Sequence, residues 1–127
     1  MINIKPFKGF VVSPDLVSLV SSPPYDTLSS REARIIVKNN SQSFLRVIKP
    51  EVDYESDRVP DKKQLHDKAS ENLENFIREG VLIKDQKPHF YIYQIHIGEH
   101  SQTGLYAAVS IRDYKNNLIK KHEHTRP

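Results

Sequence analysis

The sequence predicts an α+β fold with a mixed or antiparallel sheet, and three observations carry this prediction. One long segment shows a helical stripe of apolar residues, a shorter capped helix precedes it, and residues 88–114 hold two β-prone runs in succession. Helices and strands are mixed along the chain, but the last strands are consecutive, which favours α+β over α/β. We expect a C-terminal β-hairpin, with the long amphipathic helix and the short helix packed on the sheet.

The first half of the chain predicts an interrupted strand and then a short helix. Residues 2–12 are apolar enough for a strand, but a proline and a glycine break the run. Ser29 stands three positions before Glu32, which is the spacing of a capping box. This spacing predicts a helix over about 30–38, with its apolar residues on one side.

The middle of the chain predicts a strand, a loop and the longest helix. Residues 44–48 are β-prone and are followed by a proline, whereas residues 51–60 are polar and predict a mobile loop. Pro60 and Asp61 suit a first helical turn, and Gly80 suits a helix end. The apolar stripe between them consists of Leu65, Ala69, Leu73, Phe76 and Ile77.

The last third of the chain predicts strands. Residues 81–84 predict a brief strand, and residues 88–97 and 104–114 predict two longer ones. The connection between them, 98–103, begins with Gly98 and is followed by Gly104. No predicted helix follows these two glycines. This context excludes a phosphate-binding loop and favours a hairpin connection.

Composition limits the classes of protein. The 127 residues fit one domain with a modest core, and the absence of cysteine excludes disulfides and thiolate chemistry. No apolar run is long enough for a signal peptide or a membrane span. We therefore expect a single-domain, soluble, cytoplasmic protein without a membrane partner.

The net charge of +3 is concentrated at the C-terminus. Residues 115–127 contain four basic side chains and one acidic side chain, so the rest of the chain is neutral. Nucleic-acid-binding domains usually spread basic residues over a face together with stacking aromatics. A short basic tail does not match that pattern, and we do not expect a nucleic-acid partner.

A stiff loop presents the first pair of candidate site residues. Pro23 and Pro24 restrict the backbone just before Tyr25 and Asp26. Asp26 has the chemistry of a general base, a magnesium ligand or a contact for a substrate amine or hydroxyl. Asp is also common as a turn or helix-cap residue, and both interpretations stay open.

The C-terminal cluster presents a second set of candidates. His122 and His124 stand two positions apart around Glu123, a spacing that brings two imidazoles to one side of a strand. A zinc site needs a further protein ligand, and nothing in the spacing selects His96 or His100 for that role. We therefore predict no metal site.

The same cluster has acid–base and phosphate-binding chemistry. Imidazole titrates near neutral pH, so His122, Glu123 and His124 suit proton transfer. Ammonium, hydroxyl and guanidinium groups donate to phosphate, and the cluster supplies them from Lys120, Lys121, Thr125 and Arg126. A solvated basic strand end is the alternative.

Several landmarks occur in an order that resembles the amino-terminal part of a prokaryotic family called domain of unknown function 1015. They are Ile4-Lys5-Pro6-Phe7, Ser22-Pro23-Pro24-Tyr25-Asp26, Ser43-Phe44-Leu45, Lys49-Pro50-Glu51, Gly80-Val81-Leu82, Phe90-Tyr91-Ile92-Tyr93, Thr103-Gly104, Asp113-Tyr114, His122-Glu123 and Thr125-Arg126-Pro127. The resemblance covers essentially the whole chain. It implies a longer protein, because family members carry a downstream Asp-Gly-His-His-Arg motif that these 127 residues lack.

The resemblance also implies an activity. The downstream motif is similar to that of the ParB/sulfiredoxin-like group, which includes nucleotide-dependent kinases acting on free serine. This implies the truncated N-terminal segment of a kinase-related enzyme for a small hydroxy amino acid, with ATP or ADP and magnesium as the implied cofactors of the full-length protein. We assign catalysis to Asp26, His122 and Glu123, and substrate or phosphate binding to Tyr25, Lys121, Thr125 and Arg126.

A second hypothesis is a non-catalytic binding or assembly module. A segment of a larger protein exposes apolar surface and strand edges that the remainder would cover, and such surfaces promote association. Under this hypothesis the chain forms a homodimer through those surfaces.

Overall fold

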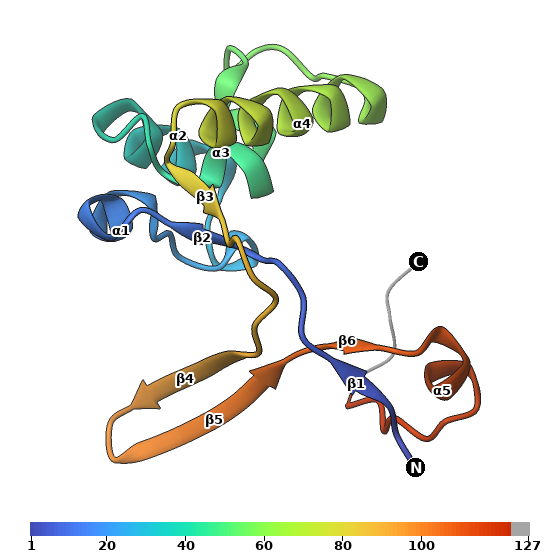
Figure 1. Ribbon diagram of the computed structural model, residues 1–127. Helices are drawn as coiled ribbons and strands as arrows, with labels where there is room; N and C mark the ends of the chain where they lie inside the picture. Colours follow the sequence, from blue (N-terminus) through green and yellow to red (C-terminus); the bar gives the residue numbers. More distant parts are fainter. Residues whose placement is uncertain (123–127) are drawn as a thin grey trace. The chain divides into compact units, whose positions relative to one another are not determined.

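The computed structural model describes residues 1–122 and confirms the predicted α+β fold (Figure 1). Contacts between residues divide the chain into two units. Phe10–Ile83 forms one unit, and Met1–Gly9 together with the chain from Lys84 onward forms the other. The expectation that residues 1–127 are a single domain of a larger protein stays a prediction.

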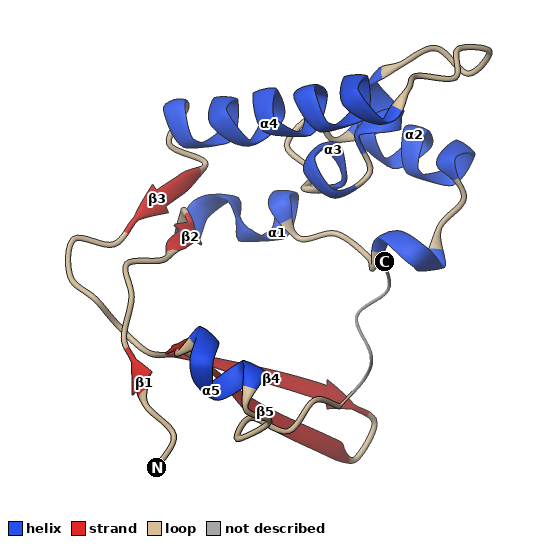
Figure 2. Ribbon diagram, turned by 90° about the vertical axis from the view of Figure 1, so that its right-hand side faces the viewer, coloured by secondary structure: helices blue, strands red, loops and turns tan. Residues whose placement is uncertain are grey.

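The unit Phe10–Ile83 is mostly helical and contains one pair of short strands, β2 and β3. In Figures 1 and 2, β2 lies beside β3, and α2 and α3 lie beside α4. Its elements in chain order are β2 (Phe10–Val12), the 3₁₀ turn η1 (Pro14–Leu16), α1 (Val17–Val20), η2 (Tyr25–Thr27), α2 (Ser30–Asn39), α3 (Leu45–Ile48), η3 (Pro50–Asp53), α4 (Lys62–Arg78) and β3 (Leu82–Lys84).

The two longest helices begin at capping boxes, which confirms the predicted helices. At α2 the Glu32 N–H donates to Ser29 Oγ over 3.2 Å, and the Ser29 N–H donates back to Glu32 Oε2 over 2.9 Å. At α4 Asp61 and Gln64 make the same reciprocal pair. Each box satisfies backbone donors that the first helical turn leaves unpaired.

The helix α4 ends as the glycine predicts. Gly80 has a φ of 73°, a left-handed conformation that glycine adopts without steric cost. The Gly80 N–H donates to Ile77 O and the Val81 N–H donates to Phe76 O, which together form a Schellman motif. Phe76 and Val81 are also packed together in the core, so the turn aims the chain into β3.

The predicted strand over residues 44–48 is wrong, because Leu45–Ile48 forms the helix α3. A strand needs a neighbouring strand to satisfy its backbone, and helical bonds such as Lys49 N–H to Leu45 O take that place here. Leu45 is fully buried in this conformation. Tertiary packing has overridden β propensity. The following turn η3 occupies the start of the segment 51–60, whose mobility stays a prediction.

Two small apolar cores hold the unit together. The first joins α4 to the strand pair and α1 through Phe76, Leu82 and Val20. The second joins α2, α3 and η3 through Ala33, Leu45 and Val52. The apolar side of α2 therefore packs on α3 and η3, while α4 packs mainly on α3 and η3 and reaches β3 through Phe76 and Leu82.

The second unit contains the remaining strands and one short helix. β1 (Ile4–Lys5) pairs antiparallel with β6 (Ala108–Val109), and β4 (Tyr91–Ile97) pairs antiparallel with β5 (His100–Tyr106). The helix α5 (Ile111–Lys115) follows β6 directly (Figure 1). This arrangement confirms the predicted hairpin and leaves the strands as small two-stranded sheets.

Two boundaries of the predicted hairpin are wrong. The connection, predicted over 98–103, consists of Gly98 and Glu99 only, because Ile97 is already paired with His100. Gly98 has a φ of 58°, which suits the first central residue of a two-residue turn. The predicted strand 104–114 ends at Tyr106, and the chain then changes partner at Ala107 to pair with β1 before it turns into α5.

A tyrosine fixes the irregular segment that the sequence marks with Pro6 and Gly9. The Tyr91 hydroxyl accepts from the Gly9 N–H over 2.7 Å and donates to the Asp85 carboxylate. The hydrogen bond to Asp85 is the main reason that the pKa of Tyr91 lies above its usual value. The Tyr91 ring also contacts Phe7, so one side chain anchors residues 7–9 and Asp85.

Candidate functional site

The loop before α2 is held rigidly enough to present its side chains. Pro24 is extended, and the Thr27 N–H and Thr27 hydroxyl both donate to Pro24 O, over 3.2 and 2.8 Å. These two bonds close the turn η2 around Tyr25 and Asp26. Both candidate side chains therefore come from one short, internally bonded turn.

Asp26 is exposed and available to a ligand. Its carboxylate makes no hydrogen bond within residues 1–122, and Tyr25 is 57% exposed. Ser29, and not Asp26, caps α2. The structure thus removes the helix-cap interpretation of Asp26 and leaves its carboxylate without a structural partner in the described part of the chain.

The C-terminal candidates are only partly described. The Lys121 ammonium lies 4.3 Å from the centre of the Tyr114 ring, a cation–π contact, and His122 is exposed. Glu123, His124, Thr125 and Arg126 lie outside the described residues. The contact with Tyr114 shows how the end of α5 positions at least one cation of the cluster.

The two sets of candidates belong to different units. Tyr25 and Asp26 lie in the unit Phe10–Ile83, whereas Lys121 and His122 lie in the other. Within the first unit, Tyr25 and Asp26 lie together on one turn. The pairing of Asp26 with the C-terminal cluster stays a prediction.

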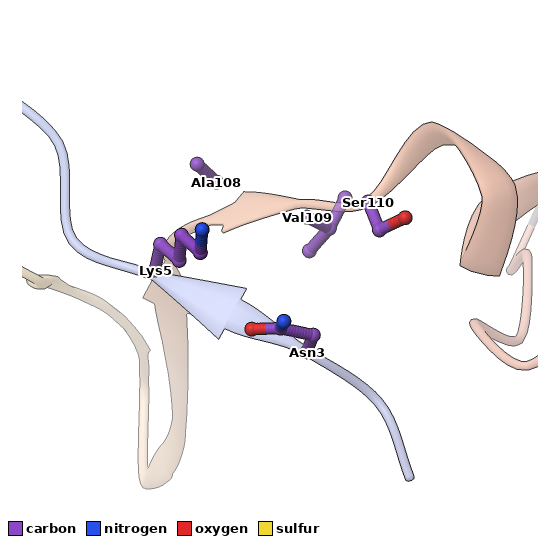
Figure 3. A pocket seen from close by; sticks show the side chains of 5 residues that line it. All are labelled: Asn3, Lys5, Ala108, Val109 and Ser110. Carbon is purple, nitrogen blue, oxygen red and sulfur yellow. The ribbon is translucent and has the colours of Figure 1, made fainter.

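A small cavity beside β1 and β6 adds residues that the sequence did not single out. It has a volume of about 330 Å³, and Asn3, Lys5 and Ser110 supply its polar side chains (Figure 3). The register that pairs Lys5 with Ala108 brings these groups together from the two ends of the chain. An ammonium, an amide and a hydroxyl around one hollow can bind a small polar or anionic group.

A buried aspartate supports this cavity. Asp113, in α5, is 6% exposed. Its carboxylate accepts a hydrogen bond from the Asn3 N–H over 3.1 Å. Its neighbour Tyr114 holds Lys121. The helix α5 therefore connects the wall of the cavity to the start of the C-terminal cluster.

Local sequence patterns could not have found this group. Lys5 stands beside a proline in a short apolar segment, and Ser110 lies inside a predicted strand. Their proximity depends on pairing the first strand with the last, which no spacing rule reveals. Two family landmarks, Ile4-Lys5-Pro6-Phe7 and Asp113-Tyr114, lie in or beside the cavity and were the available signal.

Within residues 1–122 no three His, Asp or Glu side chains lie close enough to hold a metal ion. In the same part of the chain, no helix has both the length and the apolar character needed to cross a membrane.

The fold and the candidate residues define an α+β protein with Tyr25 and Asp26 on an exposed turn and a polar cavity beside β1 and β6. A family model described as "Protein of unknown function (DUF1015)" matches residues 4–127. The chain belongs to this family, which confirms the resemblance drawn from the sequence landmarks. No curated protein and no solved structure matches the chain.

Proposed function

We propose that the protein is a cytoplasmic, kinase-related enzyme of the ParB/sulfiredoxin-like group, in which these residues form part of the active site. The substrate would be a small hydroxy amino acid such as serine, and the phosphoryl donor ATP or ADP with magnesium. Further sequence carrying the nucleotide-binding motif would complete the site. The family match over residues 4–127 and the ordered landmarks support the family, and the resemblance to that family implies the group.

The exposed carboxylate of Asp26 is the observation that carries the proposal. An aspartate on a rigid turn usually serves the turn or the following helix, but here Thr27 closes the turn and Ser29 caps the helix. Asp26 is left with no hydrogen-bond partner among the described residues. A carboxylate without a structural partner is free to accept a proton from a substrate hydroxyl.

The proposed step is an in-line phosphoryl transfer. Asp26 accepts the proton of the substrate hydroxyl while that oxygen bonds to the terminal phosphorus of the nucleotide. The bond from this phosphorus to its bridging oxygen breaks, and the shortened nucleotide leaves. Lys121, His122 and Arg126 would neutralise charge on the transferred group, which is the main requirement of such reactions.

An assay on the full protein tests the role of Asp26. We expect Asp26→Asn to lower kcat for phosphorylation of L-serine by about 10²-fold or more, since removing a general base has effects of that size. The measurement is phosphoserine formation by mass spectrometry with ATP or ADP as donor.

Asp15→Asn is the matched control. Asp15 is another exposed aspartate in a 3₁₀ turn that follows a proline, and it also lacks a hydrogen-bond partner in residues 1–122. Its substitution should leave kcat unchanged. Equal activity of Asp26→Asn and the wild type would reject the catalytic assignment.

A second candidate function is a dimerising assembly module, favoured by the surface of the β4–β5 hairpin. Alternation and register place eight residues, none of them Asp, Glu, Lys or Arg, on one face of this hairpin. They are Tyr91, Tyr93, Ile95, Ile97, His100, Gln102, Gly104 and Tyr106. Ile97 is 72% and Tyr106 54% exposed, so the part of this face away from Tyr91 is open within its unit.

A face that meets its own copy brings like residues together, so the absence of formal charge suits self-association. Sedimentation velocity over a concentration series tests the idea with two variants. Tyr93→Lys places a charge on this face and should weaken dimerisation at least tenfold. Gln94→Lys, on the opposite face, should not. A wild-type monomer at the highest concentration would reject this function.

A further inference from the structure

A second polar cavity lies within the unit Phe10–Ile83, between the start of α2 and the segment that precedes α4. Its volume is about 410 Å³. Its polar side chains come from three elements and are Ser30, Arg34, Glu51, Ser56 and Arg58. Two guanidinium groups on one small cavity are unusual in a chain whose first 114 residues carry no net charge.

The guanidinium of Arg34 is fixed in place by neutral partners. Its Nε donates to Tyr54 O over 3.2 Å, and its Nη2 donates to Glu51 O over 3.1 Å. Backbone carbonyls orient the group without cancelling its charge. The remaining nitrogen, Nη1, has no hydrogen-bond partner in residues 1–122, so the group keeps donors for a ligand.

The second guanidinium is oriented by an aromatic ring. Arg58 lies over the ring of Tyr54, 5.0 Å from its centre, and the Tyr54 hydroxyl donates to Gln64 O over 3.1 Å. Arg58 forms no ion pair with any residue that the structure describes. Stacking therefore restrains the side chain while its charge stays uncompensated.

The one carboxylate in the cavity is already neutralised. Lys49 Nζ lies 3.1 Å from Glu51 Oε1, and the Ser30 hydroxyl donates to the same oxygen over 3.1 Å. Glu51 therefore does not compensate Arg34 and Arg58. The net positive charge of the cavity resides on the two guanidinium groups.

We propose that this cavity binds a phosphate group. Two guanidinium forks match the two negative charges of phosphate and its several acceptor oxygens, whereas a carboxylate offers one charge and two oxygens. The Ser56 hydroxyl is a further donor on the cavity wall. The site is separate from Asp26 and does not depend on the proposed phosphotransferase activity.

The test is a titration of the full protein with inorganic phosphate. Isothermal titration calorimetry and the ¹H–¹⁵N NMR signals of the arginine side chains monitor the binding. Ionic strength is held constant with chloride, because surface electrostatics respond to salt. We expect millimolar or tighter binding that shifts the Arg34 and Arg58 Nε signals. A parallel titration with O-phospho-L-serine shows whether free phosphate or a phosphate monoester is the preferred form.

Two arginine variants make the test specific. Arg58→Gln should weaken phosphate binding about tenfold, the loss expected for one charge-assisted contact. Arg31→Gln removes the same charge from an exposed position on α2 outside the cavity and should change the affinity less than twofold. Equal weakening by both variants, or no saturable binding by the wild type, would overturn the proposal.

Discussion

The two units of the molecule are built in contrasting ways. Phe10–Ile83 contains two apolar cores, with Ala33 and Leu45 fully inaccessible to solvent. In the described part of the other unit, the one buried residue is the polar Asp113, which is 6% exposed. Its large apolar side chains stay open, as the 72% exposure of Ile92 shows. The helical unit encloses buried apolar side chains, whereas the described part of the strand unit has no buried apolar side chain.

The contrast follows from how helices and hairpins satisfy the backbone. A helix meets its own hydrogen bonds and needs an apolar neighbour on one side only, so short helices can close a small core. A two-stranded hairpin has two faces and two open edges, and is marginal alone. The strand unit relies on specific polar contacts, such as Asp113 to Asn3 and Tyr91 to Gly9.

The prediction with the largest expected effect on stability compares two leucines, one in each unit. Leu45→Ala should lower the free energy of unfolding by about 2–5 kcal/mol, because it opens a cavity in a closed core. Leu105→Ala, at a side chain of the hairpin that is 52% exposed, should cost well under 1 kcal/mol. Urea denaturation followed by circular dichroism gives both values. Hydrogen exchange then shows whether the loss is confined to residues 10–83. Similar costs at both positions would mean that the hairpin is covered in solution.

A pair of glycines tests the polar contacts of the strand unit. A Cβ on Gly9 would lie 2.8 Å from the Tyr91 ring and hydroxyl, so Gly9→Ala must displace the tyrosine and its hydrogen bonds. We expect a loss of about 1–3 kcal/mol. Gly104→Ala is the control, because its Cβ would meet the Tyr93 ring at an ordinary 3.7 Å. The hydroxyl signal of Tyr91 and the unfolding free energy are the measurements. An unchanged Gly9→Ala protein would show that Tyr91 does not anchor this segment.

The same contrast explains which parts of the structure could be predicted from the sequence. Helix ends depend on residues a few positions apart, so Ser29, Glu32 and Gly80 marked them correctly. Residues 44–48 were assigned wrongly, because burial of Leu45 against Ala33 outweighed their β propensity. The structure of the helical unit could thus be predicted wherever residues close in sequence determined the backbone conformation.

Candidate sites were harder to predict for the same reason. Tyr25 and Asp26 are neighbours on a proline-stiffened turn, so their joint exposure followed from local sequence. The cavity of Asn3, Lys5 and Ser110 depends on contacts such as Asn3 to Asp113, which are separated by 110 positions. Arg34 and Arg58 likewise line one cavity only after three elements have packed. Such groupings are products of tertiary structure.

The prediction with the smallest expected effect concerns the pH dependence of the capping box at the start of α2 in the helical unit. The hydrogen bonds from the Ser29 hydroxyl and then the Ser29 N–H hold the pKa of Glu32 below its usual value of 4.5. A lowered folded-state pKa contributes stability above the unfolded-state value, and that contribution is lost as the pH falls through the folded-state value. Glu32→Gln keeps the side-chain acceptor but does not titrate. We therefore expect the wild type to be slightly more stable than Glu32→Gln above about pH 5, with the difference declining below pH 4.5. Thermal unfolding of both proteins across this range measures the difference, and a difference that does not change with pH would show that the capping box acts through its geometry and not through the charge of Glu32.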